Sequence, residues 1–189
     1  MKAKIIISAI IALGLLSAWS VYPKPYNETV NGVYYQLGNE EILEDIKMHI
    51  DGKLRKPIFG DIKFEGTVAF EGEMVPRLSE DRGELDLWYE RGFGMVTSYG
   101  RTGEDGVLIP DIYHYGNIYI SSDFTQFTIT IASRDSEDKQ GSWSGTNGLM
   151  VTAPADNREE ALEITNELLN DYHRDYIRVG DTFLYNSGE

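Results

Sequence analysis

The residues best suited to acid–base or metal chemistry are few and far apart in this sequence. It contains three histidines, His49, His114 and His173, and no cysteine. A zinc site needs several His, Cys or carboxylate ligands at fixed spacing, so we predict no metal site. We expect His49 to be a partly buried, hydrogen-bonded residue and His173 to lie at a helix end. The absence of cysteine also excludes disulfides and a cysteine nucleophile.

Two glycine-containing segments match catalytic or nucleotide-binding motifs in composition only. A nucleophile elbow requires Gly-x-Ser-x-Gly, whereas residues 141–145 read Gly-Ser-Trp-Ser-Gly, with serine at the second and fourth positions. The segment Gly92-Phe93-Gly94 lacks both the third glycine of a dinucleotide motif and a following helix. We therefore assign no catalytic residue and no cofactor, and we predict that the chain does not bind nucleotides.

Carboxylates are abundant, with 31 Asp and Glu against 17 Lys and Arg and a net charge of −14. Nucleic-acid binding depends on basic residues, and no basic stretch is present, so we exclude that function. A pair of carboxylates can hydrolyse a glycosidic bond, which keeps a secreted carboxylate-dependent hydrolase of cell-wall or polysaccharide material open as an alternative. The acidic run 135–138 lacks EF-hand spacing; we interpret it as a solvated charge run, and Ca²⁺ binding stays open.

Aromatic residues make up 12% of the chain. Trp88, Tyr113 and Tyr115 fall at strand positions opposite the expected core residues, His114 lies between the two tyrosines, and Trp143 lies in the polar segment 133–148. Aromatic side chains on a sheet face can stack on sugars or anchor a protein partner. These five are the candidate binding residues. The alternative is that both sheet faces are covered and the rings belong to the core.

The N-terminal segment predicts export. Residues 1–4 carry two lysines, and residues 5–16 form an apolar run without a charged residue, as in a secretory signal. Cleavage near Ser20 would release a secreted protein. Alternatively, residues 5–23 are long enough to span a membrane as an anchor with the N-terminus inside. Both alternatives place the remainder of the chain outside the cytoplasm.

Alternating apolar and polar residues predict most of the strands. The clearest hairpin joins residues 118–120 to residues 127–131, and a strand over 107–115 requires Pro110 to lie on an edge or at a break. Gly66 interrupts an apolar face and indicates a bulge. The other expected strands are 33–37, 62–70, 85–90, 95–99, 149–153 and 176–185.

Two amphipathic helices are expected to pack on this sheet. Asn39 can cap a helix whose apolar residues Ile42, Leu43, Ile46 and Ile50 share one face. A second helix begins with a capping box formed by Asn157 and Glu160. Its apolar stripe runs over residues 161–172.

The elements together predict an α+β fold with a curved antiparallel meander covered by two amphipathic helices. Residues 1–22 form the signal peptide or anchor, residues 23–32 a tether and residues 33–189 one extracytoplasmic domain. The function expected is a non-catalytic binding or interaction protein. Its expected partners are the membrane, if the N-terminal segment is uncleaved, and an envelope protein or a glycan.

Overall fold

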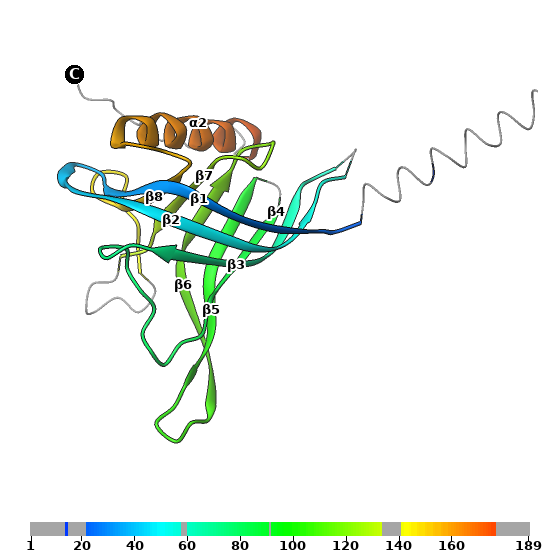
Figure 1. Cartoon of the computed structure of the whole chain (residues 1–189), viewed down its shortest axis with the longest axis vertical. Helices are drawn as coiled ribbons and strands as arrows, with labels where there is room; N and C mark the ends of the chain where they lie inside the picture. The colour runs from blue at the N-terminus through cyan, green and yellow to red at the C-terminus, as the bar shows by residue number, and fades with distance from the viewer. Residues whose placement is uncertain (1–13, 15–21, 58–59, 91, 134–140, 177–189) are drawn as a thin grey trace, which may run out of the picture.

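Each strand of this protein pairs with the next in antiparallel fashion, and the last pairs with the first, so that the sheet closes into an eight-stranded barrel (Figure 1). The computed structural model describes residues 14, 22–57, 60–90, 92–133 and 141–176, without the side chains of 173–176. The elements are β1 (Lys24–Gln36), β2 (Asn39–Arg55), β3 (Lys63–Glu71), β4 (Leu85–Glu90), β5 (Phe93–Thr102), β6 (Leu108–Ile120), β7 (Phe127–Ile131), β8 (Leu149–Ala153) and α2 (Arg158–Tyr176).

The prediction of an α+β fold with two helices is therefore wrong. The segment expected to be the first helix is β2, which pairs with β1 on one side and β3 on the other. Ile46, Met48 and Ile50 are buried at alternate positions, and this period of two belongs to a strand. Asn39, expected to cap a helix, instead accepts a hydrogen bond from the Glu41 backbone after the turn at Gly38, whose φ is 68°.

The expected tether is also part of the barrel. Residues 24–32 form the first part of β1 and pair along their length with β2. The predicted signal or anchor segment, residues 1–22, lies outside the described residues except for Gly14 and Tyr22, and the strand expected over 176–185 lies outside them except for Tyr176. In the described part of the chain, no helix has the length and apolar character needed to cross a membrane.

Side chains fill the inside of the barrel. Inward-facing residues of the strands form one apolar cluster with Phe124 from the β6–β7 loop and Val75 from the β3–β4 loop. The ring of Phe124 contacts Tyr26, Phe64 and Tyr89 with centroid distances of 5.2, 5.4 and 6.0 Å. The barrel interior is therefore a packed core.

Two facing glycines allow β2 and β3 to approach closely. Gly52 and Gly66 are register partners within an unbroken ladder, so Gly66 is not a bulge. A Cβ at Gly66 would lie 2.0 Å from the Asp51 carbonyl oxygen and 2.8 Å from the Phe64 ring. The space left by the missing side chains is thus taken by neighbouring backbone and by Phe64, an arrangement used where sheets curve.

The helix α2 covers the outer face of the barrel over β1, β6, β7 and β8 (Figure 1). The predicted cap at Asn157 is confirmed, because the Glu160 backbone donates to Asn157 Oδ1 at 3.0 Å. The Glu160 carboxylate accepts at 2.8 Å from the backbone of Asp156, one residue before the partner that a capping box uses. The predicted stripe faces the barrel, with Ala161 and Leu168 buried. Helix packing covers part of the outer face of these four strands and leaves that of β3, β4 and β5 uncovered by α2.

Candidate functional site

A two-stranded hairpin extends beyond the barrel where β5 continues into β6. The pairing of β4 with β5 ends at Thr97, and the pairing of β6 with β7 begins at Gly116. Between these points the ladder has only two strands, and Figure 1 shows it projecting away from the barrel. We call residues 99–112 the arm. Its turn is closed by a hydrogen bond of 2.8 Å from the Gly103 backbone to the Val107 carbonyl.

The arm exposes apolar side chains that a monomeric protein would normally bury. Five of the ten large apolar residues exposed in the described part of the chain lie on it, although it spans only residues 99–112. The exposed fractions are 58% for Tyr99, 58% for Val107, 70% for Leu108, 37% for Ile109 and 69% for Ile112. Grouped apolar exposure of this kind makes the arm a candidate interaction surface.

The apolar surface continues from the arm onto the barrel. Tyr99 pairs with Ile112 across the base of the arm, and it lines a hollow of about 430 Å³ together with Trp88 and Met95. Trp88 and Met95 are themselves register partners on β4 and β5. We call Trp88, Met95, Tyr99 and Ile112 the apolar strip. It is a continuous outer surface built from three adjoining strands.

Carboxylates flank the apolar strip. Glu65 on β3 and Asp86 on β4 line the same hollow as Trp88 and Tyr99. The surface therefore combines aromatic and aliphatic contact area with negative charge. A partner complementary to it would present apolar side chains beside lysine or arginine.

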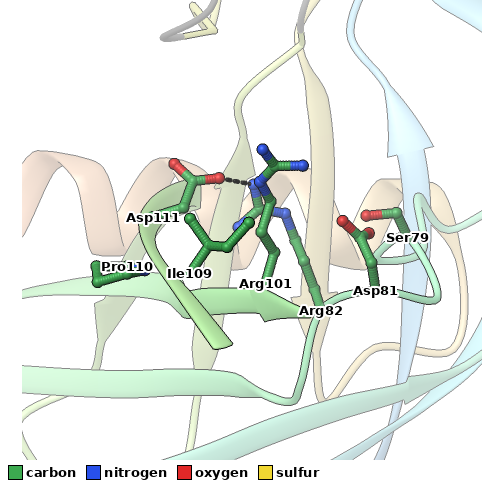
Figure 2. A pocket seen from close by; sticks show the side chains of 7 residues that line it. All are labelled: Ser79, Asp81, Arg82, Arg101, Ile109, Pro110 and Asp111. Carbon is green, nitrogen blue, oxygen red and sulfur yellow. Dashed lines mark hydrogen bonds and ion pairs between the residues drawn. The ribbon is translucent and has the colours of Figure 1, made fainter. Parts of the chain in front are cut away.

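A second hollow, of about 390 Å³, lies where the arm meets the β3–β4 loop. Figure 2 shows the side chains of Arg82 and Arg101 between Asp111 on one side and Asp81 and Ser79 on the other. Arg82 Nη2 forms an ion pair with Asp111, and the Arg82 guanidinium stacks over the Tyr113 ring at 4.9 Å. We call this the charged hollow.

The electrostatics of the charged hollow favour ionised side chains. A hydrogen bond from Ser79 is the main cause that holds the pKa of Asp81 below its usual value, with smaller contributions from its own backbone and from Arg82 and Arg101. Asp81 is therefore a carboxylate at neutral pH. Its backbone carbonyl also accepts a hydrogen bond of 2.6 Å from Thr102 and so ties the loop to the arm.

The sequence-predicted aromatic residues separate into inner and outer groups. Tyr115 is buried in the barrel, at 1% exposure, and its hydroxyl donates to the Pro76 carbonyl at 3.0 Å. Tyr113 packs against the same core. Both point inward because β6 has an extra residue between its pairings with Val96 and Thr97, which reverses the alternation. For these two residues the core alternative is correct.

The other three predicted residues lie on different faces. Trp88 is 40% exposed and belongs to the apolar strip. His114 pairs with Thr97 on the neighbouring strand and is half-buried. Trp143 lies far from the strip, where it packs against the cluster under α2, and its Nε1 is buried without a hydrogen-bond partner among the described residues. The structure thus does not gather the five candidates into one site.

The residues of the arm were not selected from the sequence, although the sequence carries a signal for them. Val107, Leu108 and Ile109 follow Gly106 and precede Pro110. A short apolar run of this kind is also typical of a buried strand. The sequence therefore did not predict that these side chains are exposed. Pro110 lies where the register shifts opposite Gly100, so the expectation of a break at that proline is confirmed.

His49 on β2 lies between a hydroxyl on β1 and a carboxylate on β3. His49 is hydrogen bonded as expected, with Nδ1 2.8 Å from Thr29 Oγ1 and Nε2 2.8 Å from the Glu71 carboxylate. Within the described ranges no three potential ligands group as a metal site. The acidic run 135–138 and the side chain of His173 lie outside the described part of the chain.

Comparison of the chain with protein-family models, curated proteins and solved structures finds no match. The functional interpretation therefore rests on the geometry of the arm, the apolar strip and the charged hollow.

Proposed function

We propose that this protein is a non-catalytic binding protein that acts outside the cytoplasm and contacts a protein partner through the arm and the apolar strip. The observation that supports this most directly is the exposure of Tyr99 and Ile112, at 58% and 69%, on a hairpin that projects from a packed barrel. Large apolar side chains are left in water at a cost in solubility. A partner that covers them removes this cost.

The partner we propose is a polypeptide with apolar side chains flanked by basic residues. Trp88 and Tyr99 offer large, rigid contact area, while Glu65 and Asp86 line the same hollow and attract lysine or arginine. The extracytoplasmic location rests on the apolar run of residues 5–16. This location is independent of the contact surface proposed on the arm and the apolar strip.

The alternative function, a carboxylate-dependent hydrolase, is not supported by the direction of the pKa shifts of the described carboxyl groups. Glycoside hydrolysis needs a carboxylic acid whose pKa is raised. Among the described residues, the pKa shifts resolved for carboxyls are all downward, for Glu71, Asp81 and Asp123. We therefore carry only the binding function forward.

Site-specific photo-crosslinking in the source cells tests the contact surface. A photoreactive phenylalanine analogue is placed at Tyr99 or Ile112, and at Asn166 on the exposed side of α2 as the control. We expect the two arm positions to capture the same protein and the helix position to capture none of it. Capture of that protein equally from all three positions, or none from the arm, would contradict the proposal.

A double variant, Tyr99→Ser with Ile112→Ser, checks that the apolar side chains carry the interaction. Crosslinking is then followed from the neighbouring exposed position Leu108. We expect at least a tenfold loss of the captured protein, because two buried apolar contacts contribute roughly 1.5 to 3 kcal/mol each. Binding of purified cell-wall glycan that depends on Trp88 instead would assign the strip to a sugar ligand and reject the protein partner.

A further inference from the structure

Arg82 in the charged hollow has a buried donor that nothing in the described part of the chain accepts. Its side chain is only 11% exposed, and Nη2 is paired with Asp111. Nη1 is buried and has no hydrogen-bond partner among the described residues. A buried N–H of a charged group that is left without an acceptor is costly, so this position favours an added acceptor oxygen.

The orientation of Arg82 is fixed before any ligand arrives. The Tyr113 ring lies under its guanidinium at 4.9 Å, and the ion pair with Asp111 holds one edge of the guanidinium. A planar guanidinium held in this way presents its remaining N–H groups in a defined direction. The ordering cost of binding is correspondingly small.

Arg101 provides a second guanidinium in the same hollow. It lines the hollow from β5, as Arg82 does from the β3–β4 loop, and Figure 2 shows both side chains among the residues that form the hollow. No acceptor within the described ranges hydrogen-bonds the Arg101 side chain, which is exposed. Ile109 and Pro110 form an apolar wall of the hollow, and an apolar wall strengthens charge-assisted hydrogen bonds.

The two carboxylates of the hollow are already occupied. Asp111 accepts from Arg82, and Asp81 accepts from Ser79 and from its own backbone. The two arginines offer ten N–H donors in all, at about five for each guanidinium. Donors therefore remain for a ligand after the internal pairs have formed.

We infer that the charged hollow binds an oxyanion, a carboxylate or phosphate group, between Arg82 Nη1 and the guanidinium of Arg101. Guanidinium groups bind carboxylates and phosphates through paired charge-assisted hydrogen bonds, and two of them line this hollow. This site faces the β3–β4 loop and does not include the apolar strip, so it stands whether or not the protein partner proposed above exists.

The test follows the side-chain Nε–Hε signals of the purified full-length chain, labelled with ¹⁵N-arginine, by NMR. Sodium acetate and inorganic phosphate are titrated separately, with sodium chloride at matched ionic strength as the control for screening. We expect saturable shifts of the Arg82 and Arg101 signals with acetate, phosphate or both, and no matching response to chloride. The relative affinities then show which oxyanion the site prefers.

The variant Arg101→Gln tests the assignment, with Arg55→Gln as the matched control on β2, outside the hollow. Because Arg101 is exposed, its variant should fold, which the thermal midpoint checks. We expect the affinity measured at Arg82 to fall about tenfold or more in Arg101→Gln, the loss of one charge-assisted contact, and to stay unchanged in Arg55→Gln. No saturable shift, a shift that chloride reproduces, or equal affinity in Arg101→Gln would mean that Nη1 is satisfied by water and would overturn the inference.

Discussion

Arg82 and Asp111 form an ion pair that joins the β3–β4 loop to the base of the arm. The loop also supplies Val75 to the barrel core, so the pair connects the packed interior to the projecting surface. The charged hollow is therefore tied both to the barrel core and to the arm.

This pair should contribute to stability through mutual coupling. We expect a double-mutant cycle of Arg82→Gln and Asp111→Asn to give a coupling free energy of about 1 kcal/mol, because Arg82 is nearly buried. Urea denaturation measures it. The more exposed pair of Lys47 and Glu71, at 56% and 60% exposure, is the control, and there we expect a smaller coupling because solvent screens the two charges. If the losses in unfolding free energy of the two single variants add up to the loss of the double variant, Arg82 and Asp111 do not stabilise each other.

The hydroxyl of Thr165 fastens α2 to the barrel. It lies 2.8 Å from the hydroxyls of Tyr35 and Thr152 and 3.0 Å from that of Thr128, and all four residues are buried. Thr165→Val leaves the others short of a partner, so we expect a loss of about 1 to 3 kcal/mol in the free energy of unfolding. Thr102→Val, at an exposed position, should change it little. If the two substitutions lowered the free energy of unfolding equally, the hydrogen bonds of the Thr165 hydroxyl would not be what stabilises the packing of α2.

Tyr115 predicts a specific dependence of stability on pH. Burial is the main cause that raises the pKa of its hydroxyl, with Tyr113 and Tyr34 adding to it. In the unfolded chain this group ionises near pH 10, whereas in the folded protein it stays neutral. Above about pH 10 the folded state therefore binds more protons than the unfolded state, and stability falls as pH rises.

The variant Tyr115→Phe isolates this effect. Near neutral pH we expect it to be about 1 kcal/mol less stable, because it loses the hydrogen bond to the Pro76 carbonyl. The phenylalanine cannot ionise, so the deficit should shrink as pH rises above about 10. Denaturation curves at neutral and alkaline pH measure the difference. A deficit that is constant over this range would refute the assigned cause.

Gly66 should be intolerant of a side chain. A Cβ there would lie 2.6 Å from Gly52 Cα as well as against the Asp51 carbonyl, so we expect Gly66→Ala to cost about 1 to 3 kcal/mol or more through steric strain. Gly83→Ala is the matched control, because nothing lies within 4 Å of its added Cβ. Thermal unfolding of both variants provides the comparison. If the two thermal midpoints shift by the same amount, the close approach of β2 and β3 does not require glycine at position 66.

The sequence by itself determined the elements whose signals are local. The alternation at Leu85, Leu87 and Tyr89 predicted β4, and Asn157 with Glu160 predicted the start of α2; both are found. Backbone conformation responds to side-chain alternation and capping within a few residues, so short-range patterns suffice. The export prediction rests on the same kind of local pattern, in residues 5–16, and stays a prediction.

Only the tertiary structure decided that residues 39–55 form a strand and on which side of the sheet each aromatic residue lies. Ile46 and Ile50 fit a helical period as well as a strand, and the choice was made by pairing with β1 and β3, which the sequence does not specify. One extra residue in β6 turned Tyr115 inward. The arm emerged because β4 and β7 stop pairing before β5 and β6 do, so that Tyr99 and Ile112 have no further strand beside them. Contacts between distant segments set these outcomes, and no local pattern encodes them.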